Sequence, residues 1–224
     1  MSSEKTMNDY EKKALNEVLM LGVTINNPVI VQAALEQDAD PDYREREDHD
    51  FYRSRQKGLT PLMIAAYQGP QALKTVSILL AAGANAQAFT KEGDDVLMFA
   101  ASGCARSLNF DQDATPLIDA LVHAGANPKT KLANGHTCLL GTLNEYDGLV
   151  STSAFTALLA HGADPDASNG NGSLIDQLKW KIEHTRSDRK PFELCLQLAQ
   201  QAIDKGRLPK RQPKMIIRIP GMKM

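Results

Sequence analysis

Cysteine is scarce in this chain of 224 residues. The three cysteines are widely spaced, so no two of them resemble a zinc-binding pair, and their density is far below that of a disulfide-rich scaffold. We therefore expect three reduced thiols in a hydrophobic core: Cys104, Cys138 and Cys195.

Long apolar runs are missing as well. The longest clean apolar stretch near the start, Val18 to Leu21, is far too short to cross a bilayer, and the opening MSSEKTMNDY has neither the basic nor the apolar region of a signal peptide. With 42% hydrophobic, 23% charged and 5% aromatic residues, the composition is that of a globular protein and excludes disordered and fibrous classes. We expect no transmembrane segment and a cytoplasmic location.

A third absence is any cluster of residues with catalytic or metal-ligating spacing. His136 and Cys138 are two positions apart, which does not place them on one helical face. His123 and His161 each precede a glycine at the end of an apolar segment, where a partly cationic ring suits the helix dipole. We therefore predict a protein that is not an enzyme, with no catalytic, cofactor-binding or metal-binding residues and no cofactor.

Two isolated features near the C-terminal end have ordinary structural explanations. Asn171-Gly172-Ser173 matches a glycosylation sequon, but without a secretory signal the segment from Asn169 to Gly172 is better explained as a turn. Trp180 lies in a helical pattern, and we predict a core or capping aromatic there rather than a platform for a ligand.

What the chain does contain is a recurring phrase, a small residue followed by Ala and then Asn or Asp. Successive copies are 45, 42 and 37 residues apart, counted from the weakest copy. Each follows apolar residues at helical spacing, so each marks the end of a helix. The copies are Gly83-Ala84-Asn85, Gly125-Ala126-Asn127, Gly162-Ala163-Asp164 and the weak copy Asp38-Ala39-Asp40.

The fullest copy runs from Gly58 to Asn85. Thr60 can cap a helix with its hydroxyl, and Pro61 suits the first helical position because it has no backbone donor. Two alanines, Ala65 and Ala66, keep this helix slim enough for neighbouring repeats to approach, and Gly69 permits the turn that ends it. A second helix then runs back, with Val76, Leu79 and Leu80 on its buried side and Gly83 closing it.

This string resembles the ankyrin repeat, whose pattern is Gly-x-Thr-Pro-Leu, two alanines, a glycine, then Val-x-x-Leu-Leu-x-x-Gly-Ala. The resemblance covers roughly residues 25 to 170. It implies an all-α, ankyrin-like solenoid of stacked antiparallel helix pairs joined by finger loops, with about four to five repeats including degenerate caps. The matching residues are Gly58, Thr60, Pro61, Leu62, Ala65, Ala66, Gly69, Val76, Leu79, Leu80, Gly83 and Ala84.

The neighbouring copies are degraded. Asp95-Val96-Leu97 stands where Thr-Pro-Leu belongs, and Asp95 can still cap. In the next copy Thr137 opens the inner helix, but Thr142 and Leu143 replace the two alanines, so we expect looser packing there.

Apolar residues on either side of these repeats predict the end caps that a solenoid needs. We predict a single domain over residues 1–205, with caps at about 8–40 and 173–205 and central repeats at about 58–170, followed by a basic tail at 206–224. The N-terminal cap should bury Ala14, Leu15, Val18 and Leu19 on one helix and Val29, Ile30, Ala33 and Leu35 on the next. The C-terminal cap should bury Leu174, Ile175, Leu178 and Ile182, and then Phe192, Cys195, Leu196, Ala199 and Ile203.

The repeat spacings exceed the usual period of about 33 residues, which implies insertions. We place them at Pro41 to Lys57, at Cys104 to Ala114 and near Tyr146 to Ser151. They either shape the surface for one partner or reflect neutral drift in solvated loops.

Charge is unevenly distributed along the chain. Residues 36–50 carry eight acids against Arg44 and Arg46, whereas residues 205–224 carry seven basic residues and no acid. The acidic run is either a contact for a basic protein surface or simply solvated. The tail could contact nucleic acid or an anionic membrane, but without an aromatic residue to stack on bases a loosely docked extension is the simpler explanation.

The resemblance also implies where a partner protein binds, since ankyrin stacks use the concave inner-helix surface and the fingertips. We consider three functions: an immunity or inhibitor protein that blocks a cognate toxin or enzyme, a general scaffold or adaptor, and nucleic-acid or membrane association through the tail. A monomer is the default state. The candidate partner-binding residues are Tyr67, Gln68, Ser102, Asn144 and Glu145 on the inner helices, Phe89, Lys91 and Lys131 on fingertips, and Tyr43, Phe51 and Tyr52 on the acidic finger.

Overall fold

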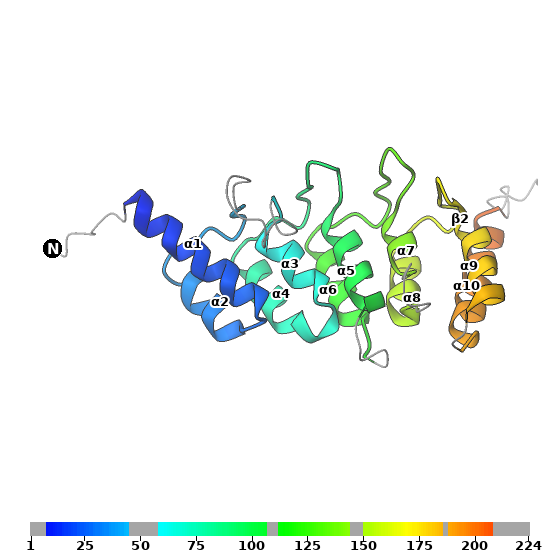
Figure 1. Cartoon of the computed structure of the whole chain (residues 1–224), viewed down its shortest axis with the longest axis horizontal. Helices are drawn as coiled ribbons and strands as arrows, with labels where there is room; N and C mark the ends of the chain where they lie inside the picture. The colour runs from blue at the N-terminus through cyan, green and yellow to red at the C-terminus, as the bar shows by residue number, and fades with distance from the viewer. Residues whose placement is uncertain (1–7, 45–57, 107–111, 144–149, 186–187, 208–224) are drawn as a thin grey trace, which may run out of the picture.

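A computed structural model describes residues 8–44, 58–106, 112–143, 150–185 and 188–207. The elements form five antiparallel helix pairs in a row, with one small hairpin (Figure 1). The pairs are α1 (Asp9–Thr24) with α2 (Pro28–Leu35), α3 (Pro61–Tyr67) with α4 (Leu73–Ala81), α5 (Val96–Arg106) with α6 (Thr115–His123), α7 (Cys138–Gly141) with α8 (Thr152–Ala160), and α9 (Leu174–His184) with α10 (Lys190–Arg207). A 3₁₀ turn, η1 (Pro70–Ala72), precedes α4, and the hairpin is β1 (Ser168–Asn169) with β2 (Gly172–Ser173). The expected all-α ankyrin-like solenoid is therefore confirmed.

Short polar side chains start the inner helices, as the sequence predicts. The Thr60 hydroxyl accepts a hydrogen bond from the backbone N–H of Met63 at 3.3 Å, and Asp95 Oδ1 accepts one from Met98 at 2.9 Å. Such caps satisfy backbone donors that have no partner within the helix. Gly69 and Gly83 both have positive φ, at 80° and 89°, so each closes its helix as expected.

The pairs stack in two layers. The first helices of successive pairs contact one another from α1 through α3 and α5 to α7, and the second helices do so from α2 through α4, α6 and α8 to α10. Loops that connect one pair to the next protrude along the same side of the row (Figure 1). We call the segments 85–95, 127–137 and 164–173 the second, third and fourth fingers, and each has a narrow antiparallel bridge or hairpin.

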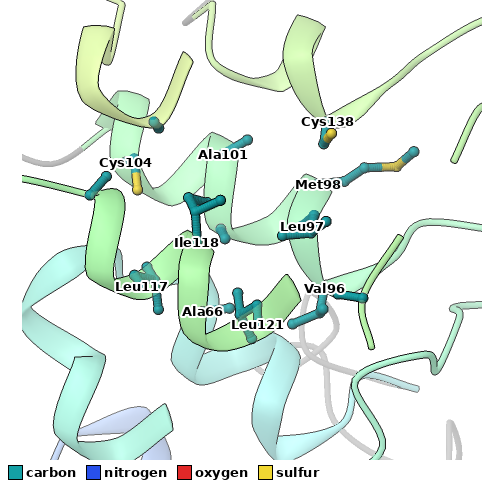
Figure 2. Packing of buried hydrophobic residues seen from close by; sticks show 14 of the residues in the cluster. Ala66, Val96, Leu97, Met98, Ala101, Cys104, Leu117, Ile118, Leu121 and Cys138 are labelled. Carbon is teal, nitrogen blue, oxygen red and sulfur yellow. The ribbon is translucent and has the colours of Figure 1, made fainter. Parts of the chain in front are cut away.

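Small residues let the layers approach closely. Ala65, Ala66, Ala100 and Ala101 are fully buried on α3 and α5, and Figure 2 shows Ala66 beside Leu121 of α6. The closest approach between two of the described helices is at Gly103, where a Cβ atom would overlap the backbone of Tyr67. The three cysteines are buried, as expected for core thiols.

Two parts of the N-terminal cap differ from the prediction. Val18 and Val29 were expected inside but are 44% and 73% exposed. Ala14 and Ala33 are also exposed. Leu19 is buried as predicted, and the other buried apolar residues of this pair are Met20, Val23, Val31 and Ala34. The apolar pattern is ambiguous here because α1 and α2 carry apolar residues on more than one face. The C-terminal cap agrees better, since Leu174, Leu178, Phe192, Cys195, Ala199 and Ile203 are buried.

The degraded repeats also differ in detail. The predicted insertion at Cys104 begins later, because α5 continues through Arg106 before the chain reaches α6 at Thr115. In the fourth pair, α7 is a single turn, Cys138–Gly141, where Thr142 and Leu143 replace the alanine pair. A hydrogen bond of 2.6 Å between His161 Nε2 and Asp119 Oδ1 connects the end of α8 to α6.

Candidate functional site

An aromatic and charged group of side chains lies where α3 and α5 meet on the inner-helix layer. The rings of Tyr67 and Phe99 meet edge to face, with centroids 6.4 Å apart and an angle of 82° between their planes. The Arg106 guanidinium lies over the Tyr67 ring at 5.9 Å. Tyr67 is nevertheless 42% exposed, so this aromatic surface is available to a partner.

The same group surrounds a shallow hollow of about 170 Å³. The α5 residues come from one face of the helix, because Phe99, Ser102 and Arg106 are three and four positions apart. The second finger contributes Asp94 and the third contributes His136. We call this group the central patch, and its residues are Tyr67, Asp94, Met98, Phe99, Ser102, Arg106 and His136.

The central patch combines features typical of protein interfaces. Tyrosine and arginine are enriched among residues that dominate binding energy, because a rigid ring buries a large area and a guanidinium makes several hydrogen bonds. The Asp94 carboxylate and the His136 ring add polar groups at the rim. A hollow of this size fits one or two side chains rather than a cofactor.

The structure brings only some of the predicted contact residues to this surface. Tyr67 and Ser102 both belong to the central patch. Gln68 is engaged within the chain, since its amide Nε2 donates to the Val23 carbonyl at 2.6 Å and so fastens α3 to α1. Phe51, Tyr52, Asn144 and Glu145 lie outside the described residues.

The remaining candidates lie on or near the fingers. Phe89 is 49% exposed on the second finger, next to the exposed Lys91, and Lys131 is exposed on the third finger. Tyr43 is half-buried and packs against the hydrophobic core. None of these four side chains is among the described residues that line the hollow of the central patch.

Sequence reasoning missed Trp180, which was expected in the core or in a cap. Its side chain is 59% exposed on α9 and stacks on His184. A positional signal was present: Trp180 is seven residues after the cap Ser173, as Tyr67 is seven residues after the cap Thr60. The two aromatics therefore occupy equivalent positions in their repeats.

The buried ionisable groups are not among the residues of the central patch. Burial raises the pKa of Asp95 above its ordinary value of 3.8, and its Oδ2 is buried without a hydrogen-bond partner among the described residues. Burial likewise raises the pKa of each cysteine thiol to about 12. Within the described residues, no group of three or more His, Cys, Asp or Glu side chains is placed to hold a metal ion, and no helix is long and apolar enough to cross a membrane.

Fold and surface together define a helical-repeat solenoid with an exposed aromatic patch on its inner layer. Residues 19–114 match the family model for ankyrin repeats (3 copies), and the resemblance seen in the sequence is confirmed. Residues 19–114 of this chain are therefore ankyrin repeats. No curated protein matches it. Ankyrin repeats are generally protein–protein interaction modules, and the family is typically non-catalytic.

Proposed function

We propose that this chain is a non-catalytic module that binds one partner protein through the central patch and the neighbouring fingers. The observation that carries the proposal is the exposed Tyr67 ring, ordered by Phe99 and Arg106 beside a hollow that can receive a partner's side chain. A ring already held in place loses little conformational freedom on binding.

Within this class, we propose an immunity or inhibitor protein that neutralises a cognate toxin or enzyme in the cytoplasm. Irregular, insertion-bearing repeats support it, because each insertion reshapes the surface for one shape of partner. The acids among residues 36–50 favour a partner with a basic surface, since opposite charges speed encounter. A scaffold or adaptor is the alternative, and it would leave its partner's activity intact.

Affinity capture from the native source with three matched baits tests the proposal. The baits are the wild-type chain, Tyr67→Ala and Tyr10→Ala. The last removes the same side chain from an 82% exposed site on α1 that is not part of the central patch. Because truncating an interface tyrosine commonly costs about 1–2 kcal/mol, Tyr67→Ala should weaken binding of the captured protein by about tenfold. Tyr10→Ala should leave it within about twofold.

The captured partner's own activity, titrated with the wild-type chain, then separates the finer possibilities. Complete loss at one equivalent supports an inhibitor, and retained activity supports a scaffold. Equal binding by all three baits would exclude the central patch. Salt-sensitive binding that disappears when residues 206–224 are deleted would instead assign binding to the basic tail.

A further inference from the structure

Helix α9 presents a second recognition surface in the last helix pair. Asp176, Trp180 and His184 are four residues apart and so lie along one helical face, with neighbouring Cβ atoms about 6 Å apart. The indole of Trp180 stacks on the imidazole of His184, with centroids 4.6 Å apart and planes at 13°. The stack covers one face of the indole, yet Trp180 remains 59% exposed.

The stack is held in place by a backbone hydrogen bond. His184 Nδ1 lies 2.8 Å from the carbonyl oxygen of Trp180, and since a carbonyl can only accept, Nδ1 is the donor. The imidazole is thereby fixed against the indole. A ligand that stacks on Trp180 therefore meets an aromatic surface that is already ordered.

A cavity of about 480 Å³ opens beside this face. Its described lining comes from α9 and from the fourth finger, and the two are fastened together by Gln177. The Gln177 amide donates to Asn169 Oδ1 at 2.9 Å and to the Gly172 carbonyl at 3.0 Å. The described lining residues are Asn171, Asp176, Gln177, Trp180 and Lys181.

The charge of this cavity favours a cation. The Ser173 hydroxyl donates to Asp176 Oδ2 at 2.7 Å, and this hydrogen bond lowers the pKa of Asp176, so the exposed carboxylate is ionised at neutral pH. Lys181 also lines the cavity, but it is buried and already engaged in an interaction within the chain. Asp176 is therefore the exposed charged residue among those described in the cavity lining.

We propose that this cavity binds an arginine side chain of the partner protein, with the guanidinium on the open face of Trp180 and hydrogen-bonded to the Asp176 carboxylate. Indole is the best cation–π surface among side chains, and a planar guanidinium can stack on it while its edge meets a carboxylate. A lysine ammonium can do only one of these well. This assignment rests on the proposed protein-binding function and specifies the partner's chemistry at one point.

The single tryptophan of the chain, Trp180, supplies the readout. Its fluorescence is titrated at fixed ionic strength with three probes, acetyl-Gly-Arg-Gly-amide and the Lys and Glu counterparts. We expect a saturable change with the Arg peptide, a response about threefold weaker with Lys, and none with Glu. Asp176→Asn should weaken Arg binding about threefold. Asp204→Asn, which removes an exposed acid from α10, should leave it unchanged.

Equal responses to the three peptides, a response that does not saturate, or no effect of Asp176→Asn would each overturn the assignment. A second variant, Trp180→Leu, lacks the fluorescent indole, so its binding is followed by backbone amide shifts in NMR. It should remain folded, because the replaced side chain is exposed, and it should bind the Arg peptide about fivefold more weakly. A chain that captures its partner through Tyr67 but does not bind the Arg peptide keeps the proposed function and loses only this assignment.

Discussion

Among the glycines within the described helices, Gly103 is the one at which the stacking of repeats depends most directly on the absence of a side chain. A Cβ atom placed there would overlap the carbonyl oxygen of Tyr67, and it would lie 2.5 Å from that residue's carbonyl carbon and 2.9 Å from its Cα. These are backbone atoms of α3, so no rotamer change can relieve the overlap. Since carbon atoms pack at about 3.5–4 Å, Gly103→Ala requires α3 and α5 to separate by about 1 Å.

The expected cost follows from two opposing terms. Overpacking of this kind typically costs about 1–3 kcal/mol, whereas replacing a helical glycine by alanine gains up to about 1 kcal/mol. Because rigid backbone blocks relaxation, we place the overpacking at its upper end, which leaves a net loss of about 2 kcal/mol. For a chain of this size the loss corresponds to about 4–8 °C in Tm.

Gly206→Ala is the matched control. Gly206 is also in a helix, near the end of α10, and a Cβ there would meet no atom within 4 Å. The substitution should therefore be neutral or stabilising by up to about 0.5 kcal/mol. Urea unfolding followed by far-ultraviolet circular dichroism measures both variants. A Gly103→Ala variant as stable as the Gly206→Ala variant would refute the close approach of α3 and α5.

Two further predictions concern buried ionisable groups. Asp95→Thr keeps the hydroxyl cap seen at Thr60 and replaces the unpaired, buried Oδ2 by a methyl group, so we expect a gain of about 1 kcal/mol at pH 7 in urea unfolding. Because the folded-state pKa of Asp95 is raised, the wild type loses stability as pH rises from below 3.8. The stability advantage of the variant should therefore be smaller at pH 3 than at pH 7. An advantage that does not change with pH would exclude the buried charge as its cause. A thiol-reactive probe at pH 8 should label no cysteine in the folded chain and three in urea, because burial raises each thiol pKa to about 12. Fast labelling before unfolding would contradict that burial. The three thiols are Cys104, Cys138 and Cys195.

The fold was predictable because the same helix-capping and turn residues recur from repeat to repeat. Thr60, Pro61 and Gly69 specify a capped helix and a turn by local chemistry alone, and the structure has both. The approach of α5 to α3 was not predictable in the same way. The ankyrin pattern has no fixed residue at the position of Gly103. The need for glycine there arises only when two helices from different repeats pack against each other.

The terminal helix pairs were harder to predict for a different reason. An inner repeat is covered on both sides, so its buried residues follow one pattern, whereas a terminal pair has a neighbour on one side only. Exposed Val29 and buried Val31 look equally suitable for a core until that neighbour is placed. The exposed position of Trp180 was hard to predict for a similar reason. Trp180 is equivalent to Tyr67, but its helix pair lacks the Thr-Pro-Leu and alanine residues that would have aligned the two in the sequence.

The contact between α3 and α5 affects both the stability of the fold and the position of the Tyr67 ring. The backbone of Tyr67 that excludes a side chain at Gly103 also carries the ring that Phe99 and Arg106 hold in place. Separating the two helices by about 1 Å would move the ring of Tyr67 away from both partners. Gly103→Ala should therefore lose more partner affinity than its unfolded fraction explains. Asp95→Thr, whose change is buried at the start of α5, should alter stability and leave affinity unchanged. That difference would show that the spacing of the repeats, and not only their side chains, shapes the central patch.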